Sequence, residues 1–313
     1  MSRSTEIIEP NAKGVIPLDI ANKVEILMEA MPYLQKYAGK TVVIKYGGNA
    51  MVSERLKDAV MHDVVLLQLL GMKPVLSHGG GPGINKMLEK LDIPVQFING
   101  LRYTSEDTMR VVEAVLVGQV NTELVGYINK LGGRAVGLSG VSGNIYQCHR
   151  RSEELGFVGD IGFVDVAAIR AVQDAGFIPV VAPVGTDGQG STYNINGDTA
   201  AGKLASALGA EKLILLTGIE GLCNSVELRD VISYLNIKDV PMLKAKGVIA
   251  GGMIPKIDCC VQAIEEGVTS VHIIDGRKPH SILYEAFTSE NLGTTIGSAQ
   301  NSIGIKSSNR EEI

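Results

Sequence analysis

A lysine that stands directly before two glycines is the first group of residues that could hold a phosphate. Residues 41–46 are β-prone and mostly apolar, Lys45 lies near their end, and Gly47 and Gly48 follow. Ligands of open α/β sheets bind beyond the carboxyl ends of the strands, and glycine lets backbone N–H groups approach an anion. We therefore expect Lys45 to face an anionic ligand. A surface lysine in an ordinary turn explains this segment equally well.

A second glycine-rich turn repeats the pattern. The strand predicted over residues 73–76 runs into SHGGGPG at residues 77–83, and residues 84–91 have the pattern of a short helix. A glycine costs roughly 0.5–1 kcal/mol relative to alanine in ordered structure, so a structural turn rarely needs three in a row. Turns ahead of helix N-termini bind anions through free N–H groups and the helix dipole. The two turns together predict an anion-binding site.

Three charged residues elsewhere stand at or near the starts of predicted helices. Arg102 precedes a long helix and could clamp a carboxylate, although a lone arginine is more often a surface residue. Asp198 precedes an alanine-rich helix, where it would either cap the helix or hold lysines or a metal at a phosphate site. Taken alone, capping is the simpler role. Lys256 follows Gly251 and Gly252 in a segment that opens another helix.

Alternating strands and helices must position these residues. Because the chain has 313 residues, we expect either two lobes or one extended α/β sheet. The long helix is expected to begin with a capping box of Thr104 and Asp107. Strands are predicted at 41–46, 73–76, 94–99, 177–182, 212–216 and 269–274, hairpins over 134–163, a mobile loop at 185–190, and helices at 19–37, 53–70, 84–91, 104–130, after 165, at 199–208 and 240–246, from 251 and from 279.

The helix predicted over residues 19–37 has no obvious place in the core. Its apolar residues recur at spacings of four and three, which puts them on one stripe: Ile20, Val24, Leu27, Met31 and Leu34. Pro32 is expected to kink or split the helix, because it lacks an N–H and clashes with the preceding turn. The stripe predicts contact with a partner chain or, equally, packing onto its own domain.

The composition excludes several classes of protein. The net charge of -5 and the sequence pI near 5.6 argue against a nucleic-acid-binding surface. The N-terminus lacks the apolar core of a signal peptide, and we expect no membrane span of about 20 residues, so the predicted location is the cytoplasm. The cysteines Cys148, Cys223, Cys259 and Cys260 have no C-x-x-C spacing, so no metal site is predicted.

Six segments resemble the acetylglutamate kinases, a group within the amino acid kinase family. In chain order they are KYGGNA, HGGGPGIN, NGLRYT, YNINGDTAAGKLA, GGMIPK and DGRKPHSILYEAFT, and the resemblance covers roughly residues 37–297. It implies ATP-dependent phosphorylation of the γ-carboxylate of N-acetyl-L-glutamate to N-acetyl-L-glutamyl 5-phosphate, the second step of arginine biosynthesis. The implied fold is a three-layer α/β/α sandwich around a mainly parallel open sheet.

The resemblance also implies a division of the chain. Residues 1–37 would form an N-terminal extension with a kinked oligomerisation helix, and residues 38–209 the lobe for the acyl amino acid. Residues 210–297 would form the nucleotide lobe, and residues 298–313 a polar tail.

Roles for individual residues follow from the same resemblance. The two lysines that act on the transition state fall on Lys45 and Lys256, and the aspartate that organises them falls on Asp198. Amides that hold the acceptor fall on Gly80 and Gly81. The remaining correspondences are the amide of Gly48 at the γ-phosphoryl group, Arg102 and Asn194 at the α-carboxylate of the substrate, and, around the nucleotide, Thr217, Gly218, Gly221, Leu222, Gly251 and Gly252.

The physical chemistry of these residues agrees with the implied reaction. A carboxylate with a pKa near 4.3 is already ionised at neutral pH, so its attack on phosphorus needs no general base. Two anions must approach each other, so the site must neutralise charge and align the groups. Lys45 and Lys256 can flank the transferred group while Asp198 keeps both extended toward it. Mg²⁺ is expected to arrive bound to the phosphates of ATP.

The N-terminal helix, with His272 and Glu285, resembles arginine-inhibited members of the family. In these, the helices interlace three dimers into a hexamer, and arginine binds beside the helix. Glu285 would pair with the guanidinium and His272 would form a second wall. Relatives in photosynthetic organisms also bind a PII-type nitrogen regulator, although no feature of this sequence indicates that contact.

Two other functions remain open from the sequence. The chain could be another amino acid kinase, with N-acetyl-aminoadipate, glutamate or carbamate as acceptor. It could also be a non-catalytic sensor of arginine or nucleotide, although a sensor would have no need to keep Lys45, Asp198 and Lys256 together. A Rossmann dehydrogenase or a P-loop ATPase is disfavoured, because neither glycine fingerprint occurs in the sequence.

Overall fold

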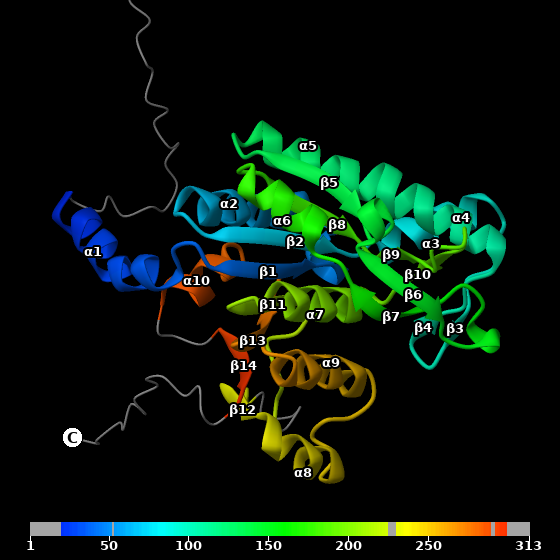
Figure 1. Cartoon of the computed structure of the whole chain (residues 1–313). Coiled ribbons are helices and arrows are strands. Elements are labelled where there is room, and N and C mark those ends of the chain that lie inside the picture. Colours follow the sequence, from blue (N-terminus) through cyan, green and yellow to red (C-terminus); the bar gives the residue numbers. More distant parts are fainter. Residues whose placement is uncertain (1–19, 52, 225–229, 289–291, 299–313) are drawn as a thin grey trace, which may run out of the picture.

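One mainly parallel sheet organises the chain (Figure 1). The computed structural model describes residues 20–51, 53–224, 230–288 and 292–298, and the expected N-terminal lead and polar tail lie outside them. Within these residues, the sheet has the order β12-β14-β13-β11-β1-β2-β8-β5, and only the β13–β14 pair is antiparallel. The strands are β1 Thr41–Tyr46, β2 Lys73–His78, β5 Ala135–Ser139, β8 Ile178–Ala182, β11 Lys212–Thr217, β12 Tyr234–Asn236, β13 Ser270–Asp275 and β14 Gly293–Gly297.

Helices cover both faces of this sheet and make the three layers that the sequence predicts. On β1, Val43 packs toward α6, α7 and α9, whereas Val42 and Ile44 pack toward α2, α5 and α10. This alternation follows from the two-residue period of a strand. The helices are α1 Ile20–Tyr37, α2 Glu54–Leu69, α3 Gly81–Lys90, α4 Glu106–Glu113, α5 Thr122–Lys130, α6 Ala167–Asp174, α7 Gly197–Leu208, α8 Val240–Ala245, α9 Met253–Glu265 and α10 Ser281–Phe287.

A smaller sheet and a short hairpin lie near the carboxyl ends of β1 and β2 in the main sheet. The small sheet has the order β10-β9-β6-β7, with β6 Tyr146–Arg150, β7 Gly159–Val164, β9 Val184–Thr186 and β10 Thr192–Asn194. The hairpin joins β3 Phe97–Ile98 to β4 Leu101–Arg102 through Asn99 and Gly100, both at positive φ. Asn-Gly favours this turn because both residues tolerate the left-handed region. The predicted strand over residues 94–99 is confirmed only for residues 97–98, because 94–96 are irregular and the chain turns at Asn99.

Other strand predictions fail where glycine hides a buried strand. The hairpins predicted over residues 134–163 are confirmed for β6 and β7, but β5 joins the main sheet beside β8. The loop predicted at 185–190 begins within β9, where a side chain on Gly185 would lie 2.3 Å from Cys148 Sγ. The Asp187 carboxylate closes the following turn by accepting from the N–H groups of Gln189 and Ser191. β12 and β14 were not predicted.

The long helix predicted over residues 104–130 contains a π-helical segment. It starts after Ser105, whose hydroxyl caps the N–H of Thr108, and the Thr104 side chain is buried instead. The predicted capping box of Thr104 is thus wrong. The segment η2 (Ala114–Asn121) widens the helix between α4 and α5. Such insertions occur often at functional sites.

The run Glu106–Lys130 also differs from the expectation that no segment could span a membrane. In the described part of the chain it is the one helical run that is long and apolar enough by length and composition. Its elements contact α2, α3, β5 and β8. Packing inside the protein therefore accounts for its apolar residues.

Helix α1 runs through Pro32 without being split. Its last turns pack on their own domain, because Tyr37 is buried and Tyr33 contacts the same core as α2 and α10. Leu27 and Met31 on the predicted stripe stay exposed, by 67% and 44%. The apolar stripe is thus only partly covered by its own chain.

Candidate active site

A cavity of about 250 Å³ lies beyond the carboxyl ends of β1 and β2, between the first turns of α3 and α7. Both predicted glycine turns open into it. Its walls carry most of the residues expected at the acceptor. The lining residues include Lys45, Gly47, Gly48, Gly79, Gly80, Gly81, Phe97, Arg102, Leu116, Asn194, Asn196 and Gly197.

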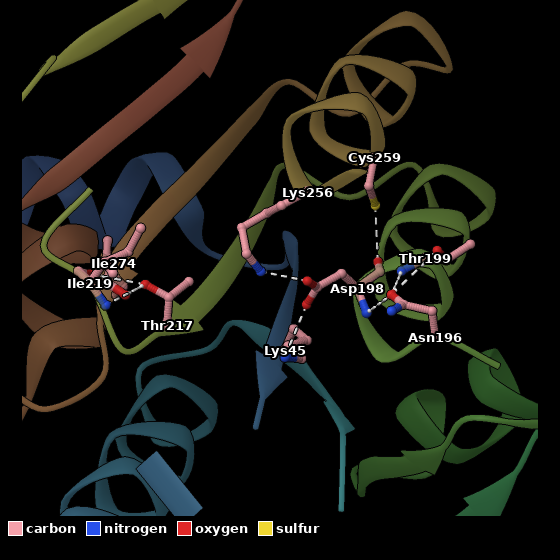
Figure 2. Close-up of polar contacts among 9 residues, drawn as sticks. All are labelled: Lys45, Asn196, Asp198, Thr199, Thr217, Ile219, Lys256, Cys259 and Ile274. Carbon is pink, nitrogen blue, oxygen red and sulfur yellow. Dashed lines mark hydrogen bonds and ion pairs between the residues drawn. The ribbon is translucent and has the colours of Figure 1, made fainter. Parts of the chain in front are cut away.

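One aspartate joins the two predicted lysines, which come from distant parts of the chain (Figure 2). Lys45 Nζ lies 3.0 Å from Asp198 Oδ1, and Lys256 Nζ donates to Asp198 Oδ2 at 2.5 Å. β1 presents Lys45, α7 presents Asp198, and α9 presents Lys256. A Cβ on Gly47 would lie 2.9 Å from Lys45 Nζ, so a side chain there would force this lysine to shift.

The charge of Asp198 is set by these two lysines. Burial alone would raise its pKa, but the positive charges of Lys45 and Lys256 lower the pKa to about 2. The predicted cap role is wrong, because Asn196 is the residue that caps α7 and accepts from the N–H groups of Asp198 and Thr199. Cys259 of α9 donates its thiol to the backbone oxygen of Asp198 at 3.0 Å.

A buried histidine supports the second glycine turn. His78 Nδ1 contacts the carbonyl oxygen of Gly79 at 2.9 Å, and its Nε2 lies 3.1 Å from Asn121 Nδ2. A carbonyl can only accept and the Asn121 amide donates, so the ring is neutral with its proton on Nδ1. Burial lowers the His78 pKa to about 4, which agrees. The sequence reasoning missed His78 and Asn121, although the histidine stands inside the HGGGPG motif.

The glycines of this turn differ in what surrounds them. The N–H of Gly79 donates to Tyr46 O at 2.8 Å, which ties the two turns together. A side chain on Gly80 would lie 2.4 Å from Leu116 of η2, whereas one on Gly81 would enter open space. The first N–H groups of α3, beginning at Gly81, have no acceptor within the helix. Gly48 has a positive φ of 64° and also lies at the cavity.

Arg102 brings a buried guanidinium to the cavity without a carboxylate partner. Its Nη2 donates to Asn85 Oδ1 at 2.5 Å, and its Cζ lies 4.8 Å from the ring centre of Phe97. Its Nη1 is buried without a hydrogen-bond partner in the described chain. Burial lowers its pKa, and an arginine still remains charged. Asn194 lies in the same cavity, and its amide donates to Thr104 Oγ1 at 3.1 Å.

A second cavity, of about 360 Å³, contains three of the residues expected around the nucleotide. Gly218, Gly221 and Leu222 line it, as does Met253, one turn before Lys256 on α9. Arg277, which the sequence reasoning missed, also lines it and is held by Asp275 through contacts of 2.8 and 2.9 Å.

The other three expected nucleotide residues shape turns nearby. Thr217 donates to the carbonyl oxygens of Ile219 and Ile274 at the end of β11 (Figure 2). Gly251 has a positive φ of 53°, and Gly252 precedes the first residue of α9. None of the three is among the described residues that line this cavity.

The two residues expected at an arginine site lie together, away from both cavities. His272 Nδ1 lies 2.6 Å from Glu285 Oε1, and both side chains are buried. Burial and nearby Lys212 lower the pKa of His272, although Glu285 opposes this shift. Burial opposes the charge on Glu285, but the contact with His272 still lowers its pKa. Lys212 donates to the backbone oxygen of Glu285 and stacks over Tyr37, the last residue of α1.

Comparison with known proteins identifies the family. Residues 40–275 match the amino acid kinase family. An acetylglutamate kinase from Heliobacterium modesticaldum is 51% identical over 292 residues, which cover 89% of this chain and 99% of that protein. The chain belongs to the acetylglutamate kinases. An acetylglutamate kinase from Synechococcus elongatus is 49% identical over 295 residues, which cover 94% of this chain and 95% of that protein.

Solved structures agree with this acetylglutamate kinase fold. An N-acetylglutamate synthase from Neisseria gonorrhoeae, complexed with coenzyme A and N-acetyl-glutamate, matches with a TM-score of 0.77 and 27% identity. The match covers 88% of this chain but only 63% of that synthase. The same synthase complexed with coenzyme A and L-arginine matches with a TM-score of 0.73 and 26% identity. A carbamate kinase from Giardia lamblia, at 17% identity and a TM-score of 0.60, shares the fold.

The donor groups of the site do not favour a metal held by the protein alone. Within the described residues, no group of three histidine, cysteine, aspartate or glutamate side chains could hold a metal ion. Both oxygens of Asp198 face lysines. The four cysteines are free.

Proposed function

We propose that this protein transfers the γ-phosphoryl group of ATP to the γ-carboxylate of N-acetyl-L-glutamate, the second step of arginine biosynthesis. The carrying observation is a cavity lined by the buried guanidinium of Arg102, which has no carboxylate partner, and by Lys45, which shares Asp198 with Lys256. Arg102 has a buried donor that an anionic ligand would satisfy. Lys45 and Lys256 share one carboxylate, so they leave a positive charge that would stabilise a negatively charged transition state. A dicarboxylic acceptor and a nucleotide phosphate supply both.

The transfer itself requires no protonation of the acceptor. A carboxylate oxygen forms the new bond to the γ-phosphorus, and the bond to the β–γ bridging oxygen breaks and leaves its electron pair on ADP. Lys45 and Lys256 neutralise the charge that spreads over the transferred oxygens. Asp198 stays ionised because both lysines lower its pKa, so it fixes their positions and does not act as a base.

The remaining residues align the acceptor. We assign the N–H groups of Gly80 and Gly81 to its γ-carboxylate and the N–H of Gly48 to the γ-phosphoryl group. Arg102 and Asn194 would hold the α-carboxylate. The supporting fact is that all five residues line one cavity.

The nucleotide would bind as MgATP in the second cavity. Gly218 and Gly221 line that cavity, and Met253 places it one helical turn from Lys256. We therefore propose an acceptor lobe over residues 38–209 and a nucleotide lobe over residues 210–297. β1 and β11 pair across this boundary, so the lobes would share one sheet. We also propose that the enzyme works in the cytoplasm.

The test is ADP formation from MgATP with three acceptors: N-acetyl-L-glutamate, N-acetyl-aminoadipate and free glutamate. We expect a strong preference for N-acetyl-L-glutamate. A longer acceptor that is turned over better would assign the chain to another amino acid kinase, and turnover of none would point to a sensor. Acceptors that differ by one methylene are separated by only about 1–3 kcal/mol in an apolar pocket, so kcat/KM must be compared.

We further propose inhibition by arginine in a hexamer of three dimers linked by α1. Support comes from the exposed stripe of α1 and from Glu285 and His272 beside its last residue. The synthase of similar fold that was solved with L-arginine also supports it. A guanidinium would have to replace the His272 contact to reach the Glu285 carboxylate. No described residue argues for contact with a PII-type regulator.

A further inference from the structure

Asn85 fixes the guanidinium of Arg102 from outside the cavity. It lies on α3 one turn after Gly81, and its Oδ1 accepts from Arg102 Nη2 at 2.5 Å. A guanidinium only donates, so the amide oxygen must face it. Asn85 is not among the described residues that line the cavity. Its observed partner is Arg102.

The contacts of Arg102 leave one part of the guanidinium for a ligand. The Phe97 ring lies against its face, Asn85 takes one nitrogen, and the buried Nη1 has no partner in the described chain. Arg102 itself is only 8% exposed. A buried donor without a partner is costly, so the ligand is required to satisfy it. A carboxylate does so with two parallel hydrogen bonds.

The chemical type of the Asn85 side chain matters as much as its position. Aspartate has the same shape and is the stronger acceptor for an arginine, so it would hold the guanidinium more firmly. It would also neutralise the charge that attracts the substrate. An amide oxygen orients Arg102 and leaves its positive charge uncompensated.

We propose that Asn85 is a positioning residue that holds Arg102 while keeping its charge free for the α-carboxylate of the acceptor. The inference rests on the proposed function, since it assigns Arg102 to that carboxylate. It assigns to the HGGGPGIN motif a second task besides the glycine amides. One helix, α3, would then serve both ends of the acceptor, through Gly81 at its start and Asn85 one turn later.

The test compares Asn85→Asp with Asn85→Ala in the full-length protein. If Asn85 only anchored Arg102, aspartate would keep the hydrogen bond and alanine would lose it. Asn85→Ala would then have the higher KM for N-acetyl-L-glutamate. Our proposal predicts the reverse order. We expect Asn85→Asp to raise KM for N-acetyl-L-glutamate by about ten-fold or more, with kcat changed by less than about two-fold, as for loss of one charged contact. KM for MgATP should not change.

Two controls separate this effect from others. Lys86→Gln changes the net charge by the same amount on the exposed side of α3 and should leave KM near the wild-type value. N-acetylglutamate α-amide has no α-carboxylate, so Asn85→Asp should not weaken its use further. Equal KM values for Asn85→Asp and wild type, or a larger rise in Asn85→Ala, would overturn the proposal. If the wild type neither turns over nor binds N-acetyl-L-glutamate by calorimetry, the proposed function fails and this inference fails with it.

Discussion

Asp198 carries a negative charge in a half-buried place because two lysines contact it. Its pKa of about 2 lies below that of a free carboxyl, so Asp198 keeps its charge throughout the physiological pH range. The net charge of Lys45, Asp198 and Lys256 is positive. This excess positive charge is what an approaching phosphoryl group and a carboxylate require.

Removing either lysine should slow the chemical step far more than it weakens binding. We predict that Lys45→Ala or Lys256→Ala lowers kcat by roughly two to three orders of magnitude, the loss seen when one preorganised electrostatic group is removed. Steady-state kinetics with saturating MgATP and N-acetyl-L-glutamate measures it. Lys86→Ala removes an exposed lysine from α3 and serves as the control. A variant that keeps the wild-type kcat would remove that lysine from the mechanism.

The neutral His78 makes stability depend on pH. Its folded pKa of about 4 lies below the usual 6.5, so the unfolded chain binds a proton more readily between these values. The contribution of neutral His78 to the free energy of unfolding is therefore fully present above pH 6.5. It is lost as the pH drops toward 4, by up to about 3 kcal/mol.

Urea unfolding at pH 7 and at pH 4.5 checks this prediction. His78→Gln lacks the titrating ring, so its stability should fall less with acidification than that of the wild type. All other titrating groups are common to both proteins and cancel in the comparison. The same pH slope in both proteins would show that His78 does not cause it.

Site residues could be recognised from the sequence where the residue type and its glycine neighbours allowed few roles. Lys45 at a glycine turn lines the cavity, and Lys256 from a glycine-led helix joins it at Asp198. Asp198 was ambiguous alone, because a cap and a salt bridge use the same carboxylate. Only the fold decides between them, by giving the cap to Asn196. Asn85 gave no signal, because an amide on a helix surface is ordinary until Arg102 is seen beside it.

The second glycine turn depends on the π-helical segment that packs behind it. Leu116 lies against Gly80, and Asn121 reaches His78 and the carbonyl oxygens of Leu138 and Val180. The π-helical turns therefore bring η2 residues both to the glycine turn and to its support. These contacts hold the backbone of the turn in place.

Alanine at Gly80 and at Gly81 should have different effects. Gly80→Ala must displace Leu116, so we expect a loss of about 1–3 kcal/mol in the free energy of unfolding, as for overpacking in a core. Gly81→Ala meets no atom, so its stability should stay near that of the wild type while its methyl group narrows the cavity and raises KM. Thermal unfolding and acceptor kinetics on both variants check this pair. Equal stability losses would contradict the packing that we describe.

Long elements were predicted better than short ones. β1, α2, β11 and α9 follow from apolar periods and clear stop signals. The β3–β4 hairpin, β9 and β14 were missed because they are short and contain or adjoin glycines. Gly293 is needed where a side chain would lie 2.0 Å from Ile273 O, a contact between strands that the local sequence cannot reveal.

The whole sheet is what brings the ends of the chain together. β1 lies beside β11, and α7 packs on α9, so Lys45 and Lys256 meet at Asp198 although they are far apart in sequence. The family resemblance implied this meeting, but composition and periodicity did not.

At the level of the assembly, we predict a hexamer whose activity falls with millimolar arginine. Light scattering gives the mass, and ADP formation at increasing arginine gives the inhibition. Glu285→Gln should raise the arginine concentration for half-inhibition by about ten-fold, since it removes one charged partner of the guanidinium. A dimer whose activity ignores arginine would contradict this part of the account.

The central claim is that a carboxylate of N-acetyl-L-glutamate receives the phosphoryl group. The most direct measurement is to run the reaction with MgATP in the presence of hydroxylamine, which captures acyl phosphates as hydroxamates, and to identify the product by mass spectrometry. We predict N-acetylglutamyl γ-hydroxamate in a one-to-one ratio with ADP for the wild type, and its near absence for Lys45→Ala. ADP without hydroxamate would mean that water, not the carboxylate, receives the phosphoryl group, and would contradict the account.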